Sequence, residues 1–229
     1  MTHLRHWIID YVHLLRGQAN SYLYRKEPKH YLGYQIKGKN PVVILPGIAE
    51  KWAFLKPIAD KISLAGHPVY IIPKLGYNFT DIPKSAAIVK EVIETNKLEK
   101  VILVAHSKGG LIGKYLMVQD KDKKISGMVA ISTPFSGSAL AKFIPHKIVK
   151  ELSTDGQTVN VLKAHKGINS HIVSIFPVYD NHVWHKQKSN LERAKNIEVN
   201  VHGHHRVLFS KDVRKKVLEE ISSLSNSGK

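Results

Sequence analysis

The 229-residue sequence has no cysteine, few acidic residues and no long apolar run. Without cysteine there is no disulfide framework, no thiolate metal site and no thiol nucleophile. Only 18 Asp and Glu residues stand against 35 Lys and Arg, which leaves a formal charge of +17. Apolar residues make up 43% of the chain, enough to bury a sizeable core. The composition therefore indicates a basic globular protein, and such a charge suggests nucleic acid or an anionic membrane surface as a partner.

The N-terminal segment has helical periodicity. We expect no signal peptide there, because Asp10 and His13 interrupt its apolar run, and no transmembrane helix, because that run is too short and too polar. Apolar side chains recur there at helical spacing, at Leu4, Trp7, Ile8, Tyr11, Val12 and Leu15. Two interpretations stay open: a helix whose apolar stripe packs on the protein body, or an interfacial anchor with Trp7 and Tyr11 at headgroup depth. We expect a cytoplasmic protein, with a peripheral position on the inner face of the membrane as the second interpretation.

From residue 41 onward, short apolar runs rich in β-branched residues alternate with longer amphipathic stretches. This pattern is typical of parallel strands buried on both faces, with helices between them. The expected strands are residues 42–45, 69–72, 101–105, 128–132, 172–176 and 197–201, and the expected helices are residues 53–65, 81–96, 107–118, 139–151, 155–165 and 212–222. We expect one α/β domain over 1–229, in which a basic amphipathic extension over 1–40 precedes the body over 41–229. Ligands bind such sheets beyond the carboxyl ends of the strands.

A serine stands at the carboxyl end of the third expected strand, in the sequence Ala105-His106-Ser107-Lys108-Gly109, and a helical stretch follows directly. Small residues two before and two after a serine are typical of a sharp strand-to-helix turn, which strains the serine backbone so that its hydroxyl projects from the sheet. The helix that begins there points N–H groups at any negative charge formed on a substrate. This context predicts that Ser107 is a nucleophile rather than a chance turn serine.

A nucleophilic serine needs a base to take its proton and a third group to orient that base. Asp180 follows the fifth expected strand, and His204 and His205 follow the last one. An acyl-transfer site also needs N–H donors for the oxyanion. The expected donors are the amide of Lys108, directly after the nucleophile, and the amide of Ile48, which follows a glycine after the first strand. The Lys108 side chain would also bring a cation near the site.

These residues resemble the α/β-hydrolase superfamily, and within it small bacterial lipases and esterases. The similar stretches are residues 41–47, 105–109, 131–137, Asp180 with Val183, and Gly203-His204 ahead of Val207 and Leu208. The resemblance implies an α/β-hydrolase fold with a mostly parallel sheet of about six or more strands, flanking helices and a small cap. It further implies a carboxylic ester hydrolase with a covalent acyl-enzyme and no cofactor. The family pattern favours His204 over His205 as the base.

The segment over 139–164 and a group of histidines each allow more than one interpretation. Residues 139–152 and 155–164 lie where they would line an acyl pocket as a small cap, or pack against the sheet. Five histidines suggest a metal cluster, at His182, His185, His202, His204 and His205. The serine triad already explains the best-placed histidine and there is no H-E-x-x-H helix, so we expect no metal.

Three functions remain: an esterase or lipase acting on a small-molecule or lipid ester, an acyltransferase using the same triad, and a basic binding protein with a degenerate hydrolase fold. No RNA-binding signature or aromatic-interleaved basic motif is present, so nucleic acid is not expected. The positive charge instead suggests peripheral contact with an anionic membrane.

Overall fold

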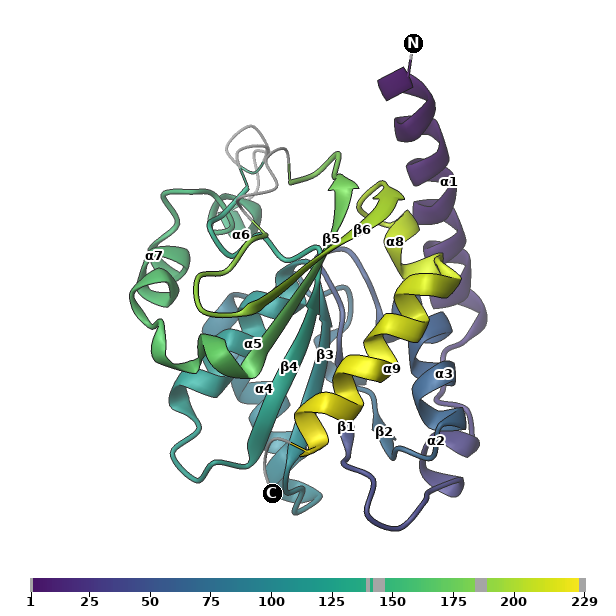
Figure 1. The fold of residues 1–229 in the computed structure, drawn as a ribbon, viewed down its shortest axis with the longest axis vertical. Helices are drawn as coiled ribbons and strands as arrows, with labels where there is room; N and C mark the ends of the chain where they lie inside the picture. The colour runs from purple at the N-terminus through teal and green to yellow at the C-terminus, as the bar shows by residue number, and fades with distance from the viewer. Residues whose placement is uncertain (1, 139–140, 142–146, 184–188, 227–229) are drawn as a thin grey trace.

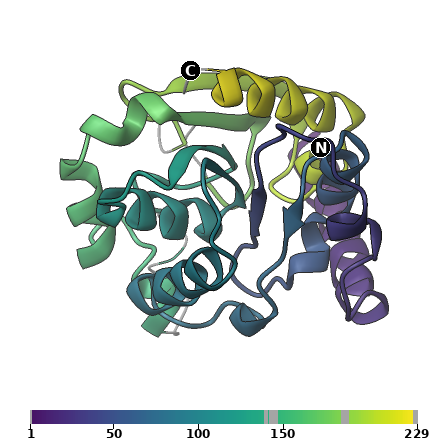
Figure 2. The same ribbon diagram turned by 90° about the horizontal axis from the view of Figure 1, so that it is seen from below.

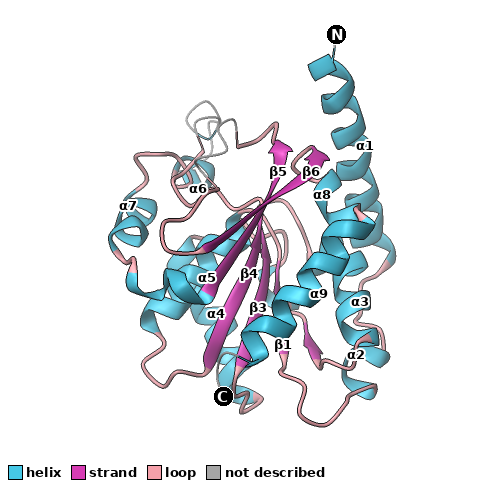
Figure 3. Ribbon diagram, in the orientation of Figure 1, coloured by secondary structure: helices cyan, strands magenta, loops and turns pink. Residues whose placement is uncertain are grey.

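The computed structural model describes residues 2–138, 141, 147–183 and 189–226. The strands are β1 (Val42–Leu45), β2 (Val69–Tyr70), β3 (Val101–His106), β4 (Ile125–Ile131), β5 (Ile172–Tyr179) and β6 (Lys195–His202). The helices are α1 (Thr2–Leu23), α2 (His30–Gly33), α3 (Lys56–Leu64), α4 (Ile82–Thr95), α5 (Lys108–Gln119), α6 (Lys147–Lys150), α7 (Gln157–Ala164), α8 (Arg206–Phe209) and α9 (Lys211–Asn226), with short 3-10 turns at η1 (Trp52–Leu55), η2 (Pro73–Leu75) and η4 (Gly167–His171). Figure 3 shows the strands as one central layer between helices.

The strands form one sheet in the order β2-β1-β3-β4-β5-β6, and all neighbours are parallel. Helix α9 crosses one face of the sheet, and α4 and α5 cover the other (Figure 2). This is the helix-covered parallel sheet that the alternating pattern predicts, so the expected fold class is confirmed. The chain runs from β1 outward to β2 and returns to β3 on the other side of β1. The switch point at which such sheets bind ligands therefore lies between β1 and β3.

Two apolar cores hold the helices to the sheet. Successive side chains of a strand point to opposite faces. From β1, Val43 and Leu45 enter the core under α4 and α5, whereas Val42 and Ile44 enter the core under α3 and α9. The helices pack against these strand residues with apolar side chains at helical spacing, namely Ile82, Ala86, Val89 and Ile93 from α4, and Val213, Val217 and Ile221 from α9. Because the central strands are buried on both faces, they are continuous apolar runs in the sequence.

Strand pairing brings distant loops together at the carboxyl edge of the sheet. In the β1–β3 pair, Leu45 lies opposite Ala105, so the loop after β1 meets the turn after β3. In the β5–β6 pair, Tyr179 lies opposite His202, so the residue after β5 meets the loop after β6. The segments that carry the expected site residues are therefore neighbours because of backbone pairing alone.

Helix α1 docks on the body through a side on which small and polar residues stand beside Leu14. Asp10, Gly17 and Ser21 are buried there, where α1 packs against η1 and α8. The apolar side faces outward as a row, which we call the outer row, in which Leu4, Ile8, Val12 and Leu15 are 68%, 58%, 57% and 67% exposed. The interpretation that this stripe packs on the body is therefore wrong. The body meets this side of α1 with the apolar turn η1, where a Cβ on Gly17 would lie 2.4 Å from the ring of Phe54, and with the loop of His205, which hydrogen-bonds to Asp10.

Helix α1 also extends past the rest of the molecule. It runs along the side of the body, and its N-terminal end projects beyond the tips of β5 and β6 (Figure 1). Trp7 turns inward, where its indole N–H donates a hydrogen bond of 2.8 Å to the hydroxyl of Tyr179, so this residue does not reach outward as an anchor would. Among the helices of the described ranges, none has both the length and the apolar character needed to cross a membrane.

Several expected elements differ in extent. Strand β2 stops at Tyr70 rather than at residue 72, because this edge strand pairs only with Val42 and Val43 of β1. The helix expected over 53–65 begins as the 3-10 turn η1 and becomes α3 at Lys56. Of the helix expected over 139–151, the structure describes only α6, and residues 139–140 and 142–146 lie outside the described ranges.

The two sides of α1 predict a contrast in stability. We expect Leu15→Ala to change the free energy of unfolding by less than about 0.5 kcal/mol, because a side chain of the outer row gains little burial on folding. Ile221→Ala in α9, at a residue with no exposed surface, should lower it by about 2–5 kcal/mol through the cavity that it leaves. Equilibrium unfolding in urea measures both. Equal losses for the two variants would show that the outer row is buried in solution.

Candidate active site

Ser107 occupies a strained turn between β3 and α5. Its backbone φ is 51°, a left-handed conformation that residues with a side chain rarely adopt. The Ser107 amide donates to the carbonyl of Ile131 at 2.9 Å, and the Thr133 hydroxyl donates to the carbonyl of Ser107 at 3.0 Å. A Cβ at Gly109 would lie 2.2 Å from the carbonyl oxygen of Leu45, so only glycine fits against β1 there. The close packing of α5 on β1 is thus the physical reason for the small residue after the serine.

His204 is held by Asp180. Its Nδ1 lies 2.9 Å from Oδ2 and 3.0 Å from Oδ1 of the carboxylate. An ionised carboxylate only accepts hydrogen bonds, so Nδ1 of the ring donates and Nε2 is the nitrogen that can take a proton. Oδ1 of Asp180 also accepts the amides of His182 and Val183 at 2.8 Å each, which fixes the carboxylate. An imidazole oriented in this way can act as a base toward a hydroxyl on its other side.

Electrostatics favour the charged forms of both partners. Burial lowers the pKa of His204, but the charge and the hydrogen bond of Asp180 outweigh it and leave that pKa above its usual value. Burial raises the pKa of Asp180, but the charge and the hydrogen bond of His204 outweigh it and leave that pKa below its usual value. His182 differs, because burial and then the neighbouring His204 and His205 lower its pKa to about 3. His182 is therefore neutral at physiological pH.

Ser107 and His204 line the same cavity. Within the described residues, the Ser107 hydroxyl makes no hydrogen bond, so the structure does not join the two side chains directly. Hydrogen bonds between a nucleophile and its base are often long before a substrate binds. Of the three side chains expected to act together, the structure places Asp180 and His204 in contact, and Ser107 lines the same cavity as His204.

The two expected oxyanion donors lie on adjacent loops, because β1 pairs with β3. The amide of Gly47 donates to Oε2 of Glu50 at 2.7 Å, and the amide of Ala49 donates to the carbonyl of Tyr77 at 2.8 Å. The amides of Ile48 and Lys108 donate to no other residue in the part of the chain that the structure describes. Both amides can therefore donate to a bound ligand.

A buried pair connects these loops to the loop of His204. His106, the residue before Ser107, donates through Nδ1 to the carboxylate of Glu50, at 2.8 and 3.0 Å from its two oxygens. Through Nε2 it donates to the backbone carbonyl of His204 at 3.0 Å. Burial raises the pKa of Glu50, but the charge and the hydrogen bond of His106 outweigh it and leave that pKa below its usual value. His106 therefore links the loop after β1 to the loop after β6.

The side chain of Lys108 points away from the cavity. It is fully buried, and its ammonium donates to the carbonyl of Asn78 at 2.7 Å and to that of Thr80. Burial lowers the pKa of Lys108 to about 8. The expectation that this side chain brings a cation to a substrate is wrong, because it fixes the loop at 78–80 instead. Asn78 in turn donates through its side-chain amide to the carbonyl of Pro46 at 2.8 Å, which holds the loop after β1.

The cavity beside Ser107 has a volume of about 310 Å³ and a mostly apolar wall. Helix α1 contributes Leu14 to it, and the segment after β4 contributes Pro134, Ala141, Val149 and Leu152. Two uses were considered for the segment between β4 and β5, namely lining a pocket and packing against the sheet. Both occur, since its residues just named line the cavity, whereas Val159 and Leu162 of α7 pack in the core beside α5. An apolar wall next to a serine and an imidazole suits the apolar part of a substrate.

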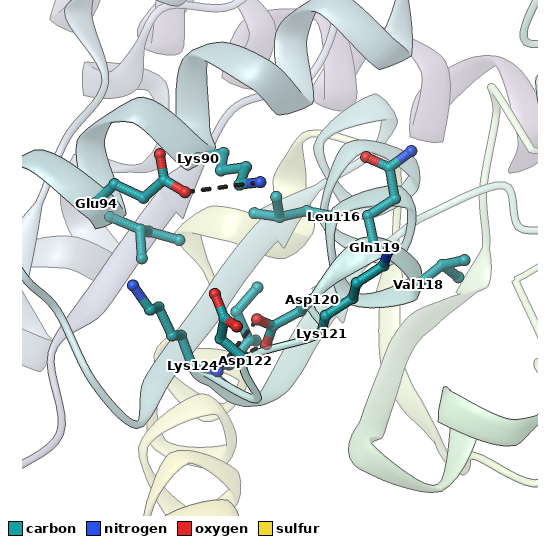
Figure 4. Close-up of a pocket in the computed structure, with 11 residues that line it drawn as sticks. Lys90, Glu94, Leu116, Val118, Gln119, Asp120, Lys121, Asp122 and Lys124 are labelled. Carbon is teal, nitrogen blue, oxygen red and sulfur yellow. Dashed lines mark hydrogen bonds and ion pairs between the residues drawn. The ribbon is translucent and has the colours of Figure 1, made fainter.

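A second cavity, of about 540 Å³, lies at the opposite edge of the sheet, where α4 and α5 end and β4 begins (Figure 4). Two of its charged residues pair with each other, and a third accepts backbone amides. Lys90 and Glu94 form an ion pair of 3.6 Å, and Asp120 accepts the amide of Lys124 at 3.2 Å. None of its described lining residues is a serine or a histidine, so this cavity lacks the groups that acyl transfer requires.

Of the histidines considered as a metal cluster, His182, His204 and His205 lie together, with ring centroids 4.9–5.1 Å apart. His202 stacks on His6 with 4.2 Å between ring centroids, and His185 lies outside the described residues. Among the residues described, one group could hold an ion: Asp10, His182 and His205 each offer one ligand atom, all within 4.8 Å of one another. A carboxylate and two imidazoles suit zinc. The hydrogen bond of 2.8 Å between Nδ1 of His205 and Oδ2 of Asp10 already joins two of the three, and an ion would have to displace it.

Three residues near the site were not found from the sequence, namely Asp10, Glu50 and His106. Asp10 left one signal, because it interrupts an apolar run of the N-terminal segment. The sequence gives no such signal for Glu50, since nothing in the residues around it distinguishes it from a surface acid. His106 stands at a position where the turn motif allows any residue, so the motif says nothing about its partners.

Comparison with known proteins agrees with the fold. A family model of the alpha/beta hydrolase fold matches residues 40–171. A triacylglycerol lipase of Pseudarthrobacter phenanthrenivorans is 29% identical over 115 residues, which are 45% of this chain and 36% of the lipase. This similarity spans just over a third of the length of that relative.

Solved structures share the fold at lower identity. The mature lipase BlEst2 of Bacillus licheniformis superposes with a TM-score of 0.67 and 14% identity, over 85% of this chain and 96% of that one. A monoacylglycerol lipase of Paleococcus ferrophilus superposes with a TM-score of 0.58 and 17% identity, over 81% of this chain and 96% of that one. At these identities the likeness establishes the fold alone.

The charge pattern predicts opposite titration of two neighbouring rings. We expect the ring of His204 to titrate above the usual imidazole pKa of about 6.5, and the ring of His182 well below it. Asp180→Asn should lower the His204 pKa, because its largest upward contribution is lost while burial still acts. Two-bond ¹H–¹⁵N NMR spectra of the rings measure both values. Asp212→Asn, at an exposed acid of α9, is the matched control and should change neither. Titration of both rings near the usual value would contradict the pairing.

Proposed function

We propose that this chain, which belongs to the α/β-hydrolase fold family, hydrolyses carboxylic esters with Ser107 as nucleophile, His204 as base and Asp180 as the acid that orients the base. The observation that carries the proposal is the Asp180–His204 hydrogen bond beside the cavity that Ser107 lines. The strained backbone of Ser107 and the unoccupied amides of Ile48 and Lys108 support it. The similarity to a triacylglycerol lipase favours esters as the substrate class.

The proposed reaction proceeds through an acyl-enzyme. Oγ of Ser107 attacks the ester carbonyl carbon while Nε2 of His204 takes the hydroxyl proton. The amides of Ile48 and Lys108 stabilise the oxyanion, and each such donor contributes about 2.7–4 kcal/mol. The tetrahedral intermediate then expels the alcohol, which receives the proton from His204, and an acyl group remains on Ser107. Water, activated by the same imidazole, releases the acid and restores the serine.

The cavity favours substrates with an apolar acyl group. Ile48, Pro134 and Leu152 lie around Ser107, and a volume of about 310 Å³ accommodates a small ligand or one end of a larger one. A small-molecule ester or one arm of a lipid ester fits this description. An acyl-enzyme of this kind can also pass its acyl group to an alcohol instead of water, and a functional assay separates the two outcomes.

The outer row of α1 favours contact with an anionic membrane surface. Its four apolar side chains are exposed, and Arg5 and Arg16 follow its end residues, so at about 100° per residue they flank the row. Apolar side chains that enter the headgroup region and basic residues that face anionic lipid act together in such helices, and each basic residue contributes about 1 kcal/mol. Leu14 of the same helix lines the cavity, so a membrane bound at α1 would lie near the site.

Replacement of the proposed nucleophile gives the direct test of function. We expect Ser107→Ala to lower kcat for short p-nitrophenyl esters by on the order of 10⁶, and to abolish labelling by a fluorophosphonate probe. Ser138→Ala, at another serine of the same cavity, is the control and should retain labelling. A folded wild-type protein that neither hydrolyses these esters nor reacts with the probe would rule out the proposal. Transfer to added glycerol in excess of hydrolysis would identify an acyltransferase.

The membrane proposal predicts binding that depends on the outer row. We expect the protein to co-sediment with vesicles containing phosphatidylserine, and binding to weaken with salt because the basic residues are screened. Ile8→Ser combined with Val12→Ser should reduce binding, since it removes exposed apolar surface from the row. Leu64→Ser, at an exposed leucine of α3, is the matched control. Equal binding of all three proteins, or no binding of wild type at low salt, would contradict a role for α1.

A further inference from the structure

Helix α1 contacts three loops that carry proposed catalytic groups. Trp7 donates to the hydroxyl of Tyr179, the residue before Asp180. The side-chain amide of Gln18 donates at 2.8 Å to the carbonyl of Ala49, the residue after Ile48. Between them along the helix, Asp10 binds the loop of His204. At about 100° per residue, positions 7, 10 and 18 fall within about 80° of one another around the helix, on a side that adjoins the outer row.

Asp10 is fully buried, and both of its carboxylate oxygens accept hydrogen bonds. Its Oδ1 accepts the amides of His205 and Arg206 at 2.7 and 2.9 Å, and its Oδ2 accepts Nδ1 of the His205 ring at 2.8 Å. A carboxylate removed from water is costly unless it is hydrogen-bonded, and these three donors supply its hydrogen bonds. The backbone immediately after His204 is therefore fixed by a side chain that comes from the other end of the chain.

The loop is shaped to receive this carboxylate. Gly203 has a φ of 127°, a conformation that residues with a side chain rarely adopt. A Cβ built on Gly203 would lie 2.4 Å from Oδ1 of Asp10. The glycine before His204 is thus required by the approach of Asp10 as well as by the backbone. Residues on both sides of His204 contact the same carboxylate.

We propose that α1 belongs to the catalytic framework of this hydrolase, with Asp10 as a positioning residue that sets the place of His204. The inference rests on the proposed function. Two neighbouring histidines are each bound by a different carboxylate: Asp180 binds His204, and Asp10 binds His205. By binding the ring of His205, Asp10 leaves His204 as the imidazole that serves Ser107. It also prevents the 203–206 loop from rotating and presenting the wrong histidine.

The charge of Asp10 acts on His204 as well. The charged and titratable groups that face His204 are Asp180 after β5, Asp10 on α1, Glu50 after β1, His106 at the end of β3, and the rings of His182 and His205. Burial lowers the pKa of His204, and Asp180, Asp10 and Glu50 in turn raise it. Neutralising Asp10 removes one of these upward contributions. The His204 pKa should then fall, which a change in folding stability alone would not produce.

The test compares Asp10→Asn with Glu27→Gln in the full chain. The control removes one negative charge from the same N-terminal segment at an exposed position. Both are assayed at a temperature at which circular dichroism shows them folded. For Asp10→Asn we expect kcat on a short p-nitrophenyl ester to fall by about 10–100-fold with little change in KM, the loss typical of a misplaced catalytic group. The acid limb of the kcat/KM profile should move to lower pH, and the amides of His205 and Arg206 should exchange faster with deuterium. Glu27→Gln should match wild type in every measurement.

Asp10→Asn with the kcat, pH profile and amide exchange of the control would overturn the inference. If Asp10→Asn does not fold, Gln18→Ala and Trp7→Phe take its place, because each removes one hydrogen bond from α1 to a catalytic loop. We expect both to lower kcat several-fold at constant KM, and unchanged kcat in both would also overturn the inference. Failure of the proposed function is distinguishable, since wild type would then lack ester hydrolysis and probe labelling while the amide exchange of Asp10→Asn still reported on the loop.

Discussion

The parallel pairing of the strands is the constraint on which the site depends. In a parallel sheet all carboxyl ends lie at one edge, so every loop that follows a strand starts there. The β1–β3 pair then sets the Ile48 loop against the Ser107 turn, and the β5–β6 pair sets Asp180 against the His204 loop. Side-chain contacts refine an arrangement that backbone hydrogen bonds have already made. The apolar cores on both faces keep that edge in place, and helices on both sides leave only its rim open to a ligand.

Around that edge, three buried carboxylates are each matched to one imidazole. Asp180 binds His204, Asp10 binds His205, and Glu50 binds His106. The pairs are interlocked, because His106 also reaches the backbone of His204, and Asp10 also reaches that of His205 and Arg206. Removal of one member of a buried pair leaves an uncompensated group, so such clusters tolerate little change. The rigidity of the site arises from these pairs, and its chemistry is assigned to only one of them.

The sequence predicted the parts of this molecule that depend on local patterns. The strand runs, the turn at Ser107 and the order of Asp180 and His204 follow from apolar periodicity and from the chemistry that a serine nucleophile requires. The partners of Glu50 and Asp10 could not be predicted, because they lie 56 and 195 residues away along the chain. The orientation of α1 was also beyond periodicity. An apolar stripe shows that a helix has two sides, but the surface offered by the rest of the fold decides which side is buried.

The contact between Asp10 and His205 also bears on the order in which the molecule is assembled. It joins residues 195 positions apart, so nearly the whole chain forms the loop that this contact closes. Closing such a loop is entropically expensive and comes after local contacts have formed. During synthesis, the ribosome adds 195 residues after Asp10 before it reaches His205. Helix α1 therefore has no Asp10–His205 contact until the 203–206 loop has been made, and the geometry around His204 is completed only when this contact forms.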